Sequence, residues 1–375
     1  MKILIAGDFC DMHRVKNAIS EENYSLMFDG IKEVMEQTDI RVVNFEFPIV
    51  EKEAKPIKKC GPNLIGQKKA IDAIKYAGFN VCTLANNHIL DQGEECCINT
   101  KRLLEAAGIQ IVGVGYNLKD ASKILYIEHS GETIAIINCC ENEFSIATEE
   151  TPGSYPLNPV KQYYQITEAR QNATYVLVIV HGGHEHFRLP SPRMKEVYHY
   201  FISIGADAVV NHHQHCYSGY ELFEGKPIIY GLGNFLFDWN STKRTPWTDG
   251  YMVVLDTDMC TFEMIPYFQS IEEPCVTLMD SKDKKVFLEK IEQLNDVISD
   301  DMELERQVND YYASFSNFEL SVLEPYRGRI MTFLFSKGFL PRFIRGSKLV
   351  QILNHITCES HLDKLRYALR LATKK

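Results

Sequence analysis

Residues 76–88 read YAGFNVCTLANNH and contain, in order, a helix end, a glycine, a short apolar run and a polar cluster. Residues 67–77 place their apolar side chains at helical spacing, and Gly78 is suited to end that helix. Residues 81–84 are typical of a strand that is buried on both faces. This stretch therefore predicts a helix that leads directly into a parallel strand, with polar side chains after the strand.

The same order of helix, glycine and strand recurs along the first two thirds of the chain. Helical patterns at residues 97–107 and 191–204 end at Gly108 and Gly205. Other short apolar runs, rich in β-branched residues, lie at 2–6, 41–45, 109–112, 133–137, 175–180, 208–210, 227–230 and 251–255. Strands that alternate with helices indicate βαβ units. We therefore predict an α/β domain over residues 1–265.

The pattern changes after about residue 265. Apolar residues at helical spacing occupy 283–298, 303–315, 327–335, 348–356 and 360–372. We predict a boundary between residues 265 and 282, followed by an α-helical C-terminal region over 282–375. No low-complexity linker separates the two parts, so they are free to pack together.

Composition narrows the class of protein and its compartment. The chain has 375 residues and a net charge of −10, and no apolar run approaches the ~18 residues that a spanning helix needs. The opening MKILIAGDFC is too short in apolar residues for a signal peptide. Eleven scattered cysteines without a CxxC motif are typical of a reducing compartment. These features predict a cytoplasmic protein.

The basic residues gather at one end. Residues 326–375 carry 11 Lys and Arg against Glu359 and Asp363, while the rest of the chain is strongly acidic. This balance is unlike that of a nucleic-acid-binding protein, so we expect no nucleic-acid partner. Aromatic residues and arginines alternate in the tail. Either its helices pack on the main domain and expose their arginines, or the region makes peripheral contact with an anionic membrane.

Potential metal ligands follow five of the predicted strands, and these positions include seven of the 12 histidines. Because strand ends of an α/β sheet meet at one edge, we expect these side chains to converge. In strand order they are Asp8 and Cys10, then Asn44 and Glu46, then Asn86, Asn87 and His88, then His181, His184, Glu185 and His186, and finally His212, His213 and His215. Carboxylates, an amide and imidazoles favour one or two divalent ions such as Mn²⁺, Fe²⁺, Zn²⁺ or Co²⁺.

Two spacings sharpen the prediction of a metal site. His213 and His215 are separated by one residue, so an extended backbone would point both imidazoles to the same side. Glu46 could bridge two ions ~3.5–4 Å apart, as in two-metal hydrolases. Cys10 is either a packed thiol or a ligand.

The order of these motifs resembles a known family. GD, NFE, ANNH, HGG followed by Glu185, HHxH and YGLGNF (230–235) are similar to the CapA family of capsule and poly-γ-glutamate synthesis proteins. That family belongs to the calcineurin-like metallophosphoesterase superfamily. The resemblance covers about residues 1–255. It implies a four-layer sandwich in which two β-sheets are flanked by helices.

The resemblance also implies a role for particular residues. His88 matches the histidine that lies near the leaving group and donates a proton. The residues that match metal ligands are Asp8, Glu46, Asn87, His181, His213 and His215. Residues that could support the site or touch the substrate are Cys10, Asn44, Asn86, Glu185, His212 and Asn234.

The sequence departs from the superfamily at three motifs. Asp8-Phe9-Cys10 stands where Asp-x-His is common, and Asn44-Phe45-Glu46 replaces Gly-Asp-x-x-Asp. Asn211-His212 precedes His213 where a glycine is usual. We therefore keep two hypotheses open. The first is a metal-dependent hydrolase of capsule or cell-envelope polymer synthesis, acting on a phosphoester or related anionic substrate, either a small molecule or a polymer. The second is a non-catalytic scaffold of a polysaccharide or poly-γ-glutamate synthesis complex with a degenerate metal site.

Overall fold

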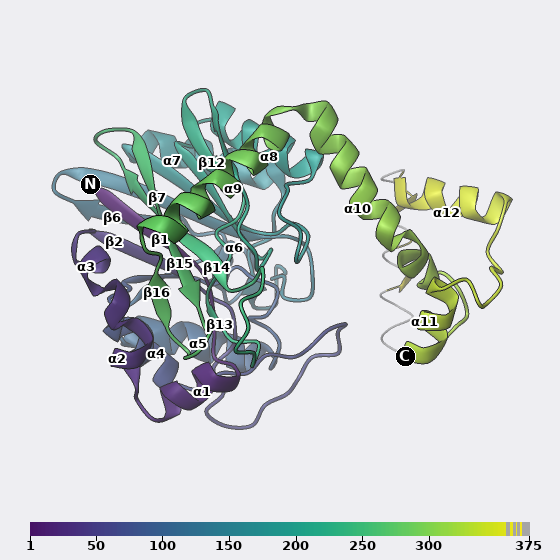
Figure 1. Cartoon of the computed structure of the whole chain (residues 1–375), viewed down its shortest axis with the longest axis horizontal. Coiled ribbons are helices and arrows are strands. Elements are labelled where there is room, and N and C mark those ends of the chain that lie inside the picture. The colour runs from purple at the N-terminus through teal and green to yellow at the C-terminus, as the bar shows by residue number, and fades with distance from the viewer. Residues whose placement is uncertain (358–360, 363–364, 366–367, 370–375) are drawn as a thin grey trace. The chain divides into compact units, whose positions relative to one another are not determined.

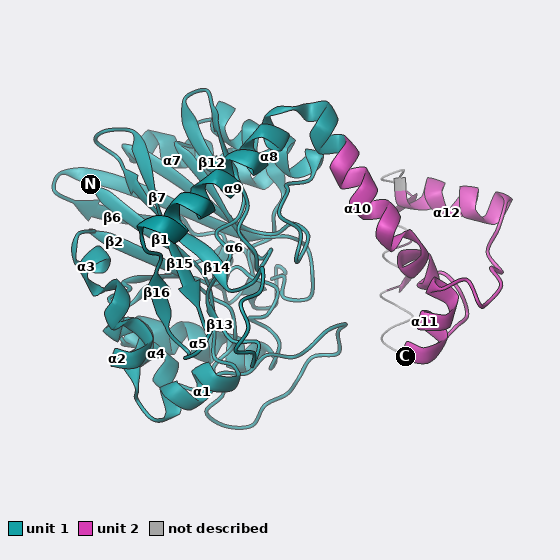
Figure 2. Ribbon diagram, viewed as in Figure 1, with its two compact units in different colours: residues 1–305 teal, residues 306–375 magenta. Residues whose placement is uncertain are grey.

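The computed structural model describes residues 1–357, 361–362, 365 and 368–369. The chain forms two compact units, residues 1–305 and residues 306–375 (Figure 2). This division lies C-terminal to the boundary that we expected at 265–282. Helix α9 (Ser281–Ser299) belongs to the first unit because its Phe287 and Ile291 are buried in that unit's core.

The first unit contains two large β-sheets (Figure 1). The strands of the first sheet are β1 (Lys2–Cys10), β2 (Ile40–Phe45), β3 (Val81–Thr83), β4 (Gln110–Val112), β13 (Asn234–Phe237), β14 (Asp249–Asp256), β15 (Thr261–Gln269) and β16 (Val276–Leu278). Their order is β16-β15-β14-β1-β2-β3-β4, and β13 pairs with the end of β1. Strands β1 to β4 are parallel, so their carboxyl ends lie at one edge.

The second sheet is built mostly from later parts of the chain. Its strands are β6 (Leu125–His129), β7 (Glu132–Cys140), β9 (Tyr175–His181), β10 (Ala208–His212), β11 (Tyr220–Phe223) and β12 (Lys226–Ile229). Their order is β11-β12-β10-β9-β7-β6, and the central strands β7, β9, β10 and β12 are parallel. Strands β5 (Val114–Gly115) and β8 (Gly153–Ser154) form a separate small sheet.

Alternate residues of β1 show how the sheets pack. Ile3 and Ile5 lie in an apolar core shared with Leu177 and Ile179 of β9, which places this core between the two sheets. Leu4 belongs instead to a core shared with the helices on the outer face of the first sheet. Those helices are α1 (His13–Ser20), α2 (Tyr24–Phe28), α3 (Lys32–Glu36), α4 (Lys69–Tyr76) and α5 (Glu94–Ala106), with the 3₁₀ turn η1 (Asp29–Ile31).

Helices α7 (Pro159–Asn172) and α8 (Pro192–Ser203) pack against β7, β9 and β10 of the second sheet, and α6 (Leu118–Ala121) adjoins the small sheet. The order of layers is thus helices, sheet, sheet and helices. The predicted four-layer α/β sandwich is confirmed. Among the described residues, no helix is both long enough and apolar enough to cross a membrane.

The second unit is helical. It contains the C-terminal part of α10 (Asp301–Ser321), followed by α11 (Arg329–Ser336) and α12 (Ser347–Thr357). The helix expected at 360–372 falls largely outside the described residues.

Candidate metal centre

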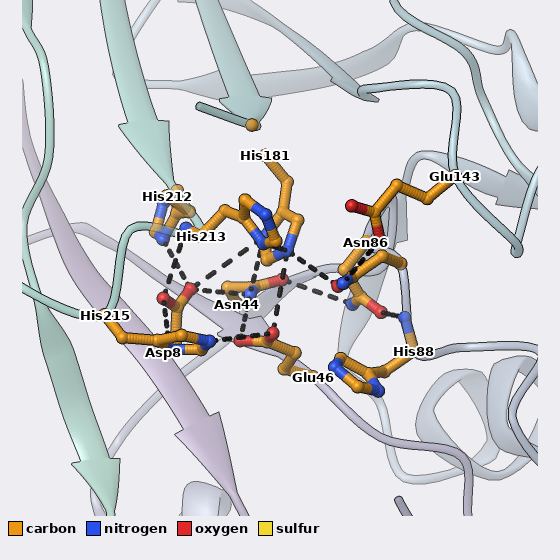
Figure 3. Close-up of polar contacts among 12 residues, drawn as sticks. Asp8, Asn44, Glu46, Asn86, His88, Glu143, His181, His212, His213 and His215 are labelled. Carbon is orange, nitrogen blue, oxygen red and sulfur yellow. Dashed lines mark hydrogen bonds and ion pairs between the residues drawn. The ribbon is translucent and has the colours of Figure 1, made fainter. Parts of the chain in front are cut away.

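The predicted site residues meet where the carboxyl ends of β1, β2 and β3 face those of β9 and β10 (Figure 3). Asp8 lies inside β1, at a register shift, and is paired with Asn44 of β2 and Asn234 of β13. The remaining polar residues come from the strand ends and the turns that follow them. Segments far apart in the sequence therefore converge because parallel strands end at a common edge.

Asp8 is at the centre of one side of the cluster and is 1% exposed. The Asn44 side-chain amide donates to its Oδ1 over 2.7 Å, and the His213 backbone N–H donates to its Oδ2 over 3.2 Å. The His212 and His215 Nδ1 atoms lie 3.3 Å and 3.6 Å from the Asp8 carboxylate. Burial opposes ionisation of Asp8, but its contacts with His212, His181 and His215 outweigh burial and lower its pKa.

His181 Nε2 is at the centre of the other side. It lies 3.1 Å from Asn87 Oδ1, 3.0 Å from His213 Nδ1 and 3.6 Å from Glu46 Oε1. All four atoms can offer a lone pair, whereas the two facing imidazole nitrogens can share only one proton. These four lone pairs are better matched to a cation, which can accept all of them, than to a network of hydrogen bonds, which would need more protons.

The Glu46 carboxylate supports the same conclusion. Glu46 is fully buried, and its Oε1 has no hydrogen-bond partner within the described part of the chain. A buried carboxylate oxygen without a partner is costly, and it is normally paired with a donor or a metal. Burial raises the pKa of Glu46, and the nearby Asp8, Glu185 and Asp91 carboxylates raise it further. The residues present therefore fit a divalent cation.

Three overlapping groups of residues could each hold a metal ion. Within each group, one ligand atom of every residue lies within 4.8 Å of the ligand atoms of the others. They are Glu46 with His181 and His213, Asp8 with Glu46 and His215, and Glu185 with His213 and His215. Glu46 belongs to the first two groups, which is the arrangement expected of a carboxylate shared between two ions.

The reason that His213 and His215 face the same site differs from our expectation. Strand β10 ends at His212, so the alternation of an extended strand does not place them. Instead, both residues have left-handed backbone conformations, with φ of 90° at His213 and 56° at His215. Such conformations are unfavourable for residues other than glycine and are often found at functional sites. The convergence was predicted correctly, but its mechanism was wrong.

His88 is held by two residues that sequence reasoning missed. Its Nδ1 lies 2.6 Å from Asp91 Oδ2, and Lys59 forms a buried ion pair with Asp91. Asp91 was visible as a polar residue in the ANNHILD segment, but nothing in the sequence around Lys59 connects it with the site. Glu143 was also missed. It accepts a hydrogen bond from the Asn87 amide over 2.9 Å, which leaves Asn87 Oδ1 turned to His181.

Most of the expected supporting residues are in place. The Asn86 side chain bonds to Asn44 and to the His88 backbone N–H, and Asn234 Oδ1 lies 2.9 Å from His215 Nδ1. The structure places Cys10 differently. Its thiol packs in the apolar core on the helical side of the first sheet, and burial raises its pKa. The packed thiol is thus the correct alternative for Cys10.

The family model described as bacterial capsule synthesis protein PGA_cap matches residues 2–239. The chain belongs to this family. It is 32% identical to the "Capsule biosynthesis protein CapA" of Bacillus anthracis over 65% of the chain, which corresponds to 62% of that relative. It is 28% identical to the "PGA biosynthesis protein CapA" of Bacillus subtilis over 76% of each protein. The predicted membership of the CapA family is confirmed.

This PGA_cap protein is also similar, at low sequence identity, to several solved structures. One is a novel phosphatase from Mycoplasma pneumoniae, with 16% identity, a TM-score of 0.44, and coverage of 76% of this chain and 96% of that one. Another is a putative 5'-nucleotidase from Staphylococcus aureus, with 16% identity, a TM-score of 0.44, and coverage of 79% and 58%.

The site of the PGA_cap protein opens into a cavity of about 400 Å³. His88, Asn87, Glu185 and His215 form its polar wall. The rest of the lining is Met12, Lys59, Cys60, Gly61, Pro62, Leu64, Glu143, Phe144, Phe237 and Trp239. Among these residues, Phe144 and Trp239 are 42% and 44% exposed, so the lining includes aromatic rings that are open to solvent.

Proposed function

We propose that this PGA_cap protein is a metal-dependent hydrolase that acts on a phosphoester or a related anionic substrate. The observation that carries the proposal is the set of lone pairs around His181 Nε2, together with the buried, unpartnered Oε1 of Glu46. A neutral hydrogen-bonded core would not leave four atoms with lone pairs, one of them a carboxylate oxygen, turned toward one another.

In the proposal, six side chains hold one or two divalent ions. They are Asp8, Glu46, Asn87, His181, His213 and His215. A divalent cation in such a site supplies Lewis acidity, which activates water and neutralises charge on a phosphoryl group. The outer contacts orient these ligands: Asn44 supports Asp8, Asn234 supports His215, and Glu143 fixes the Asn87 amide.

His88 is the proposed catalytic residue. Because Asp91 accepts a hydrogen bond from Nδ1, the proton of neutral His88 is held on that nitrogen and Nε2 is available to exchange a proton. Lys59 neutralises Asp91, so the carboxylate orients the imidazole without leaving an unpaired buried charge. His88 lines the cavity, where its imidazolium form, which carries a second proton on Nε2, would give that proton to the departing oxygen of a bound ester.

The proposed biological setting is the synthesis of a capsule or another cell-envelope polymer, in the cytoplasm. Family membership and the names of the two Bacillus relatives support the role in polymer synthesis, and the scattered cysteines support the cytoplasm. The substrate is therefore an anionic small molecule or an anionic polymer of that pathway.

One observation favours the non-catalytic alternative. The residue two positions after Asp8 is Cys10, and it points into the apolar core instead of supplying a ligand. The first metal position then has one ligand fewer than the Asp-x-His arrangement offers. A scaffold protein that keeps the fold with a weakened site would show this pattern.

A metal analysis combined with an activity assay separates the two functions. Full-length protein is equilibrated with Mn²⁺, its bound metal is measured by mass spectrometry, and hydrolysis of p-nitrophenyl phosphate and bis-p-nitrophenyl phosphate is followed. We expect one or two equivalents of metal and turnover that His88→Ala abolishes while the metal is retained. The matched control is His129→Ala, because His129 is an exposed residue of β6. Absence of turnover supports the scaffold, whether the weakened site retains metal or is empty, and it contradicts the proposed hydrolase.

A further inference from the structure

The exposed surface of the second unit combines positive charge with large apolar side chains. Residues 325–357 contain six Lys and Arg but no Asp or Glu. All six are exposed: Arg327, Arg329, Lys337, Arg342, Arg345 and Lys348. The preceding acid, Glu324, is 9% exposed and accepts hydrogen bonds from the Phe343 and Ile344 backbone N–H groups. It therefore contributes little negative charge to the surface.

The apolar residues of this segment are unusually exposed. Ile330 and Phe333 of α11 are 74% and 57% exposed, and Phe339, in the turn after α11, is 73% exposed. Val350, Leu353 and Ile356 of α12 are 68%, 61% and 51% exposed. Soluble surfaces carry isolated apolar residues, but a run of this kind within one short segment indicates a binding surface.

Both helices have the pattern of an interfacial amphipathic helix. In α12, Leu349, Val350, Ile352, Leu353 and Ile356 fall within one arc of the helix, and Lys348 precedes them. In α11, Ile330 and Phe333 lie on one side, and Arg329 and Lys337 are placed at the two ends of the helix. Apolar residues that enter the acyl region, flanked by basic residues at headgroup level, are the recognised requirement for binding an anionic bilayer surface.

The exposed phenylalanine that follows α11 is held by a small folded core. Phe335 is 3% exposed, and its ring lies 5.5 Å from that of Tyr326, whose hydroxyl donates to the Pro341 carbonyl over 2.6 Å. These contacts join the two ends of the turn that carries Phe339. The turn is thus presented on a folded support instead of being a loose tail.

We propose that residues 326–357 form a docking surface for an anionic membrane. The surface combines two weak signals, apolar insertion and positive charge, and peripheral membrane binding generally requires two. Charge complementarity favours an anionic bilayer over a neutral one. This proposal does not depend on the metal centre, so its test needs no enzymatic activity.

The test is co-sedimentation of full-length protein with vesicles of 30% phosphatidylglycerol and 70% phosphatidylcholine, compared with pure phosphatidylcholine. We expect binding to the anionic vesicles that weakens at 0.5 M NaCl, since salt screens the charged contribution. The double variant Arg327→Gln/Arg329→Gln is expected to lower the affinity by about 30-fold. Phe339→Ser is expected to lower it by about 10-fold, with little change in its salt dependence.

Matched controls come from the first unit. Lys119→Gln/Lys161→Gln removes the same charge from exposed positions, and Met259→Ser removes a side chain that is 70% exposed. We expect these variants to bind like the unchanged protein, with circular dichroism confirming that all variants are folded.

Three results would overturn the proposal. One is equal sedimentation with and without phosphatidylglycerol, and another is unchanged binding of both second-unit variants. The third is a dimer without vesicles that Phe339→Ser dissociates, combined with no vesicle binding, which would assign the surface to a second copy of the chain.

Discussion

The Glu46→Gln substitution tests the metal centre through protein stability. It is expected to raise the stability of the metal-free protein and to reduce the stabilisation that metal gives. Burial, together with Asp8 and Glu185, raises the pKa of Glu46 in the metal-free fold. A carboxyl whose folded pKa is raised contributes its stability below its unfolded pKa of ~4.3 and loses it as pH rises. Glutamine mimics the neutral acid. The variant is therefore expected to match the unchanged protein near pH 4 and to be more stable than it at pH 8.

Metal acts in the opposite direction, because it stabilises the unchanged protein more than the variant. With free metal at 100 times its Kd, a bound ion stabilises the unchanged protein by about 2.7 kcal/mol. Loss of a supporting residue outside the ligand set lowers metal affinity by 10- to 100-fold, so we take ~100-fold as a modest estimate for losing the Glu46 carboxylate. At the same metal concentration, the stabilisation of the variant then falls to about 0.4 kcal/mol.

Differential scanning fluorimetry at pH 8, with and without Mn²⁺, measures both effects. At roughly 2 °C per kcal/mol, Tm is expected to rise by about 5 °C for the unchanged protein and by about 1 °C for Glu46→Gln. Glu128→Gln is the control, because Glu128 is an exposed residue of β6. An equal Mn²⁺ shift in Glu46→Gln and the unchanged protein would refute the assignment of Glu46 as a ligand.

Three further predictions follow from other contacts. Lys59→Met leaves the fully buried Asp91 without its lysine partner and is expected to cost about 3–5 kcal/mol in thermal unfolding, whereas Lys58→Met, at an exposed position, changes little. Phe287→Ala removes an α9 ring that lies 4.5 Å from the Tyr217 ring and is expected to cost about 3–5 kcal/mol, so an unaltered Tm would contradict the place of α9 in the core. Burial lowers the pKa of His181, so this imidazole is neutral and available to bind metal at pH 7. Mn²⁺ affinity measured by calorimetry is therefore expected to be level from pH 7 to 8 and to fall under acidic conditions, because protons then compete for the ligands. Constant affinity down to pH 4 would argue against imidazole ligands.

The sequence was sufficient for the parts of the fold that depend on local pattern. The parallel strands were predicted because they are short, apolar and bounded by glycine or polar residues, as at Val81–Thr83. Strand β15 was missed because only part of Thr261–Gln269 is buried, so its residues do not form a continuous apolar run. Helix α9 was predicted as a helix, but its spacing could not show that Phe287 inserts into the core between the sheets.

The same limit applies to the candidate site. Asp8, Asn87 and His181 could be expected to converge, because each lies close to the carboxyl end of a parallel strand. The roles of Lys59 and Glu143 could not be predicted, because they reach the site from irregular segments whose path is decided by tertiary packing. The left-handed backbone of His213 was equally hidden, because that conformation is rare outside glycine and leaves no signal in the sequence.

The most direct test of the central claim is anomalous diffraction from crystals of the full chain soaked in Mn²⁺. We expect one or two anomalous peaks bounded by Glu46, Asn87, His181 and His213, with Asp8 and His215 around the second position. A crystal in which Mn²⁺ binds elsewhere, or in which this cluster holds no Mn²⁺ at millimolar concentration, would contradict it.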